Sequence, residues 1–236
     1  MSQRARSAAI STLISVLCLG VTGCGQEEVP YKPRGAATGA KANLPPAANL
    51  PKRPIKNGDV WTVWGASYSL RSHVHRKEVA GKRLSIGGYI VKSNIGSAPP
   101  CAVHKAGKAD PEDCKAPVPA FWIGDTKDAP EADCIKVMGW ASNFAQIFDA
   151  IDEFDKGKDN AEYNDANWGV KVPNPLPAVG AKVTVTGVYG VSFSKASSGA
   201  EADPFMGVMD FQEMTIQEPA AELATLPGKK RKEPKK

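Results

Sequence analysis

Alternating apolar and polar residues recur along the middle of the chain, and a period of two is typical of β-strands. In residues 82–93, for example, Leu84, Ile86 and Ile90 share one face. The pattern predicts strands at residues 60–70, 82–93, 120–125, 135–140, 181–193 and 206–217. The chain is therefore expected to be mainly β.

One helix is predicted between the fourth and fifth of these strands. Asn143 and Gln146 have the spacing of a capping box, and Lys156-Gly157 supplies a stop. The residues between them repeat at intervals of three and four, as an apolar helix face does. The residues of this face are Phe144, Ile147, Phe148, Ile151 and Phe154.

From residue 82 onward the order of elements is β-β-β-α-β-β, and this order resembles an OB-fold. Gly87-Gly88 suits the bend that a long first OB strand needs. The expected fold is thus an OB-fold-like small barrel with an extra N-terminal strand at 60–70; the alternative is a small β-sandwich. The resemblance implies ligand binding across the second and third barrel strands. The candidate ligand-binding residues there are Phe121, Trp122, Met138 and Trp140.

The N-terminus has the pattern of a secretory signal. A basic start precedes the apolar run 10–21, which is too short to span a bilayer as a helix. The run ends in Val21-Thr22-Gly23-Cys24, which resembles the lipobox of bacterial lipoproteins. The resemblance implies that residues 1–23 are cleaved and that Cys24 carries lipid, including palmitate, in a membrane. Gly25 after the lipidated cysteine resembles the sorting signal for the outer membrane.

Composition divides the remaining chain into three parts. Residues 24–56 are rich in Pro, Ala and Gly and read as a disordered linker, and residues 219–236 read as a disordered basic tail. The basic residues concentrate in these two parts. In the domain expected at 57–218 acidic residues outnumber basic ones, so nucleic acid is not expected as a partner.

Three cysteines belong to the expected domain. A lipoprotein folds outside the cytoplasm, where thiols oxidise, so the polar loop between Cys101 and Cys114 is predicted to be closed by a disulfide. Cys134 would then be an odd thiol. A Cys114–Cys134 disulfide is the alternative pairing.

Metal binding is a second hypothesis for the same loop. Cys101, His104, Cys114 and Cys134 could supply four ligands, although their intervals are irregular for a structural zinc site. A separate pair, His73 and His75, would project to one face if it lay in a strand.

No sequence motif indicates catalysis: the chain has no Gly-x-Ser-x-Gly, no phosphate-binding loop and no His-Glu-x-x-His. We therefore expect a non-enzymatic envelope lipoprotein without a cofactor. Its lipid would hold it on the membrane, and its domain would bind cell-wall polysaccharide or an envelope protein. A periplasmic metal-binding protein is the alternative function, and a hydrolytic enzyme the third.

Overall fold

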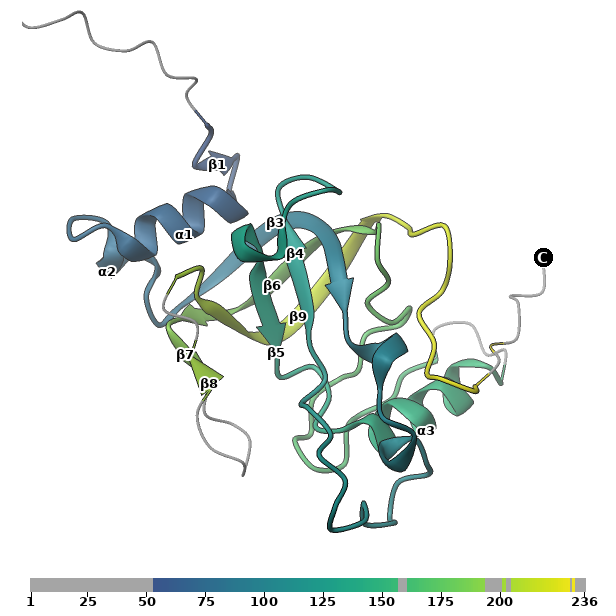
Figure 1. Ribbon diagram of the computed structural model, residues 1–236. Helices are drawn as coiled ribbons and strands as arrows, with labels where there is room; N and C mark the ends of the chain where they lie inside the picture. Colours follow the sequence, from purple (N-terminus) through teal and green to yellow (C-terminus); the bar gives the residue numbers. More distant parts are fainter. Residues whose placement is uncertain (1–52, 157–160, 194–200, 203–204, 230, 232–236) are drawn as a thin grey trace, which may run out of the picture. The chain divides into compact units, whose positions relative to one another are not determined.

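The structure of the chain is a computed structural model that describes residues 53–156, 161–193, 201–202, 205–229 and 231 (Figure 1). The expected signal peptide, the lipidation site Cys24 and most of the linker lie outside the described residues. Within them, no helix is both long and apolar enough to cross a membrane.

Five strands close into a barrel in the order β3-β4-β5-β9-β6-β3. Neighbouring strands are antiparallel except for β5 and β9, which are parallel. Helix α3 (Phe144–Phe154) lies in sequence between the third and fourth strands. The strands are β3 (Lys82–Ser93), β4 (Phe121–Gly124), β5 (Ile135–Met138), β6 (Lys182–Gly190) and β9 (Val208–Glu218). This is the expected OB-fold-like topology.

Strand β3 closes the barrel because it pairs on both edges. Its residues 82–89 pair with β6 and its residues 89–93 pair with β4. Leu84, Ile86 and Ile90 are buried, as the alternation predicted. At Gly88 an added Cβ would lie 2.7 Å from the backbone oxygen of Gly124, so the close approach of β3 to β4 requires glycine.

The prediction of a strand at 60–70 is wrong for most of its length. Strand β2 (Val60–Thr62) pairs in parallel with β3 and antiparallel with the short β1 (Lys56–Asn57), and helix α1 (Val63–Arg71) follows directly. The Thr62 hydroxyl caps α1 by accepting from the Gly65 N–H at 2.9 Å. Because β1 begins at Lys56, the domain also starts slightly before the expected residue 57.

The remaining elements are short. Helix α2 (Arg76–Val79) follows α1, and strands β7 (Ser192–Phe193) and β8 (Glu201–Ala202) form a separate antiparallel pair. Three 3-10 turns cover Ile95–Ser97, Pro100–Ala102 and Glu131–Asp133.

Helix α3 begins where the sequence predicted. The Asn143 side chain accepts from the Gln146 N–H at 3.0 Å, and the apolar face packs into the core. The Gln146 side chain does not complete a capping box: its oxygen instead accepts from the Tyr163 hydroxyl and the Ala166 N–H, so it ties a later loop to the helix.

The prediction of a disordered tail from residue 219 is wrong for residues 219–229 and for Arg231. Leu226 is 1% exposed and belongs to the core. Lys229 lies 2.8 Å from Asp152 and Arg231 lies 3.0 Å from Asp155, so this segment covers the acidic side of α3 (Figure 1, yellow). Asp152 and Asp155 are therefore paired with basic residues of this segment.

Candidate binding surface

Three of the four residues expected to bind ligand lie in the interior. Phe121 and Trp140 belong to the main core, with ring centroids 6.2 Å apart, and Met138 belongs to a second, smaller cluster. Each is 0% exposed, so these three side chains stabilise the barrel and present no surface to a ligand. Trp122 alone of the four is partly exposed.

The strand alternation explains this division. In β4, Phe121 and Ile123 point into the barrel, so Trp122 between them points outward. In β5, Lys136 points outward between two buried neighbours. Met138 is on the same outer side, but the second cluster covers it. The other buried members of that cluster are Ala120, Phe193 and Val208.

Trp122 is flanked on both neighbouring strands by lysine. It pairs in register with Lys92 of β3 and with Lys136 of β5. The two ammonium nitrogens lie 4.8 Å and 5.3 Å from the indole centroid, within cation–π distance. Lys92 also forms an ion pair with Glu131 at 2.8 Å. An indole face and two cations therefore lie side by side on the outside of the barrel.

A second tryptophan packs against the same outer cluster. Trp168 contacts Phe193 edge-on, with centroids 6.1 Å apart, and like Trp122 it is partly buried against the cluster around Met138. We call Lys92, Trp122, Lys136 and Trp168 the Trp–Lys surface. Sequence reasoning missed Trp168 because it lies in an irregular segment with no periodicity.

A buried carboxylate holds Trp168 in place. Asp165 is 1% exposed and accepts three backbone N–H bonds, from Ser142, Asn167 and Trp168, at 2.6 to 2.9 Å. Such bonds offset the cost of burying a charged group. The loop that carries Trp168 is thus fixed to the chain just before α3.

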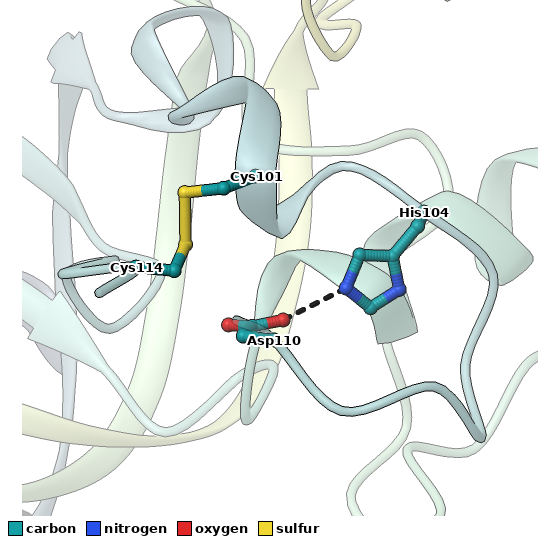
Figure 2. Close-up of a disulfide and its surroundings, with 4 residues drawn as sticks. All are labelled: Cys101, His104, Asp110 and Cys114. Atoms are coloured by element: carbon teal, nitrogen blue, oxygen red, sulfur yellow. Dashed lines mark hydrogen bonds and ion pairs between the residues drawn. A yellow bond between two sulfur atoms is a disulfide. The ribbon is translucent and has the colours of Figure 1, made fainter. Parts of the chain in front are cut away.

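The disulfide loop joins β3 to β4. Cys101 and Cys114 are bonded, with Cα atoms 5.9 Å apart, as predicted (Figure 2). Inside the loop His104 bonds to the Lys105 carbonyl at 2.9 Å and to the Asp110 carboxylate at 2.8 Å. The backbone N–H of Ala106 lies 3.3 Å from the Asp149 carboxylate of α3.

Two of the four groups considered as metal ligands, the sulfurs of Cys101 and Cys114, are bonded to each other in the disulfide. His73 and His75 lie in the turn between α1 and α2 rather than in a strand, so the geometry assumed for that pair is absent. Across the described part of the chain, no group of three His, Cys, Asp or Glu side chains is placed to hold a metal ion.

Cys134 is the remaining described cysteine, and its thiol is reduced and buried. The thiol donates to the Pro130 carbonyl at 3.3 Å. Burial raises its pKa to about 11, and the nearby Asp133 and Glu131 carboxylates add to the shift. The folded protein therefore keeps this group as an unreactive thiol at neutral pH.

Comparison with known proteins gives no relative from which a function could be transferred. No protein-family model matches the chain, and neither a curated protein nor a solved structure matches it.

Proposed function

We propose that the protein is an envelope lipoprotein, anchored to the outer membrane through lipid at Cys24, and that its barrel is a non-catalytic binding module. The ligand assigned to it is an acidic oligosaccharide of the cell envelope, bound at the Trp–Lys surface. The observation that carries this assignment is Trp122, partly exposed on the outer face of β4 with lysine on both sides.

The chemistry of this surface suits an acidic sugar chain. Indole faces pack against the apolar faces of sugar rings, while ammonium groups pair with carboxylates or phosphates. Cation–π contacts at exposed sites contribute only about 0.5–1 kcal/mol, and an exposed ion pair such as Lys92–Glu131 contributes about 0–1 kcal/mol, so a ligand can compete for the lysines. The Trp–Lys surface therefore presents indole faces and ammonium groups, which are the groups that bind such a sugar chain.

Calorimetry with defined sugars tests the binding site. The probes are a hexamer of uronic acid and a neutral hexamer of N-acetylglucosamine, titrated into the mature chain carrying Cys24→Ser. We expect only the acidic hexamer to bind, and Trp122→Ala to weaken it roughly tenfold, which corresponds to about 1.4 kcal/mol. Lys136→Ala should weaken binding most at low salt, where exposed charges are least screened.

Trp64→Ala is the matched control, since Trp64 is a partly exposed tryptophan on α1 and not part of the Trp–Lys surface. Equal losses of affinity in Trp64→Ala and Trp122→Ala, or no binding of either hexamer, would contradict the assignment of an acidic oligosaccharide to the Trp–Lys surface.

Cell fractionation tests the anchor separately. The unaltered chain should sediment with outer membranes, and Cys24→Ser should appear in the soluble periplasmic fraction, because several acyl chains are needed for stable attachment. If the Cys24→Ser protein still sedimented with membranes, the lipid would not be what holds it there.

A further inference from the structure

A second candidate site lies between helix α1 and the turn that joins β4 to β5. It is a groove of ≈ 590 Å³, open to solvent. We call it the α1 groove and define it by Arg53, Trp64, Arg71, Pro130 and Phe205. None of these residues belongs to the Trp–Lys surface.

The walls of the α1 groove are fixed in the folded chain. The Asp125 carboxylate, from the turn, accepts the Val63 N–H at 2.8 Å and the Trp64 N–H at 2.9 Å. These bonds attach the first turn of α1 to the β4–β5 turn and place a negative charge where the helix dipole favours it. A ligand therefore meets a preformed groove, which lowers the entropic cost of binding.

Arg71 is oriented to receive an oxyanion. Its guanidinium lies 4.6 Å from the centroid of the Phe205 ring, and its Nε donates to the Ser67 carbonyl at 3.2 Å. Within the described structure, no residue accepts a hydrogen bond from its two terminal nitrogens. A guanidinium held by stacking offers those N–H groups as a fork that matches a carboxylate.

The groove is lined by charges of both signs: Arg53 and Arg71 are its cations, and Asp125 and Asp133 are its acids. The Asp125 carboxylate accepts from the first backbone N–H groups of α1. The feature that suits a carboxylate is therefore local, the guanidinium fork of Arg71, and not the charge of the groove as a whole.

Exposed aromatic rings continue from the groove along α1. Trp64 stacks on Tyr68 with centroids 5.0 Å apart, and Tyr68 and Phe205 are 44% and 56% exposed. Trp, Tyr and Arg are the residues that contribute most energy at protein interfaces. A run of anchors longer than one pocket fits an extended chain better than a small molecule.

We propose that the α1 groove docks an extended segment of a partner protein. An acidic side chain of that segment pairs with Arg71, and a neighbouring proline or aromatic residue packs on Trp64. This interaction is independent of oligosaccharide binding, because it uses a different surface.

A phage-displayed library of random 12-residue peptides tests the proposal. The library is selected on the mature chain carrying Cys24→Ser, and the enriched peptides are synthesised for affinity measurement. We expect enrichment of peptides with Asp or Glu next to Pro or an aromatic residue. Arg71→Ala should weaken their binding roughly tenfold or more, and Arg71→Lys should recover only part of it, since lysine lacks the planar fork.

Two control variants separate this site from others. Arg76→Ala removes an exposed arginine of α2 outside the groove, and Trp122→Ala removes the centre of the Trp–Lys surface; both should bind the selected peptides unchanged. No enrichment, enrichment of non-acidic peptides, or equal losses in Arg71→Ala and Arg76→Ala would overturn the proposal. If free benzoate bound with the same dependence on Arg71, the groove would be a site for small carboxylates, and the proposal of a protein partner would be wrong.

Discussion

At the scale of single residues, His104 has a chemistry that its sequence position did not reveal. Both of its ring nitrogens face acceptors: one faces the Lys105 carbonyl, and the other faces the Asp110 carboxylate, as Figure 2 shows. A neutral imidazole can donate from only one nitrogen, so only the protonated ring satisfies both bonds. The bond to the Lys105 carbonyl, followed by the bond to Asp110, raises the pKa of His104 above its ordinary value, against small opposing effects of burial and Lys108.

We predict that the disulfide loop is held more firmly in acid than in alkali. Because the folded pKa is raised, the stabilisation is fully present below about pH 6.5, the unfolded value, and is lost as pH rises through the folded pKa. Hydrogen exchange of residues 103–113, corrected for intrinsic rates, should report faster opening above that pKa.

The pKa of His104, measured by NMR, should fall in Asp110→Asn, which removes the carboxylate partner. Asp113→Asn is the matched control, because Asp113 lies in the same loop and is not among the groups that shift His104. Equal pKa values for His104 in the two variants would contradict this interpretation. Both variants keep Asp149 of α3, whose carboxylate accepts from the Ala106 N–H of the loop.

At the scale of elements, α1 shows how two periods can compete in one stretch of sequence. Alternation predicted a strand at 60–70, yet Val63, Ala66 and Leu70 also fit a helical face, and it is this face that is buried. Thr62 caps the helix locally, and Asp125 completes the cap from 61 and 62 residues away. A partner so distant in sequence cannot enter a local pattern.

The C-terminal segment is the second element that the sequence pattern concealed. We predict that Leu226→Ala lowers the free energy of unfolding by about 2–4 kcal/mol, since it removes a buried side chain from the core. Leu223→Ala, at a residue 40% exposed, should change it by less than about 0.5 kcal/mol. Urea unfolding of both variants measures the difference. Equal effects would mean that the segment does not pack on the domain.

At the scale of the whole molecule, barrel closure and the disulfide are independent constraints. The barrel closes through β3, which pairs with β4 and β6, whereas the disulfide joins two residues of one connecting loop. In the loop-entropy model such a disulfide stabilises the fold by restricting the unfolded chain.

We predict that Cys101→Ser with Cys114→Ser lowers the free energy of unfolding by about 3 kcal/mol, as the loop-entropy model gives for a loop of this size. The far-UV circular dichroism of the native barrel should remain. Reductant should bring the unaltered protein to the same urea midpoint as the double variant and leave that variant unchanged. A midpoint of the unaltered protein that is insensitive to reductant would show that the disulfide contributes no stability.

The sequence by itself predicted the order of the barrel elements and the start of α3, and it favoured the pairing of Cys101 with Cys114 while leaving Cys114–Cys134 open. These features depend on local periodicity, a local cap and the oxidising compartment that the N-terminal pattern implies. It also placed a candidate site on β4 and β5, but alternation alone could not say which face of each strand was outward. Burial decided that Phe121 fills the core and that Trp122 does not.

Only the tertiary structure brought together residues that are distant in sequence. It placed Lys92 beside Trp122, packed Trp168 against the same outer cluster as Trp122, joined α1 to Asp125, and packed Leu226 into the core. Each of these contacts joins segments that are far apart in sequence, so no local pattern predicts it. The contact can stabilise the protein only after folding has brought the two segments together.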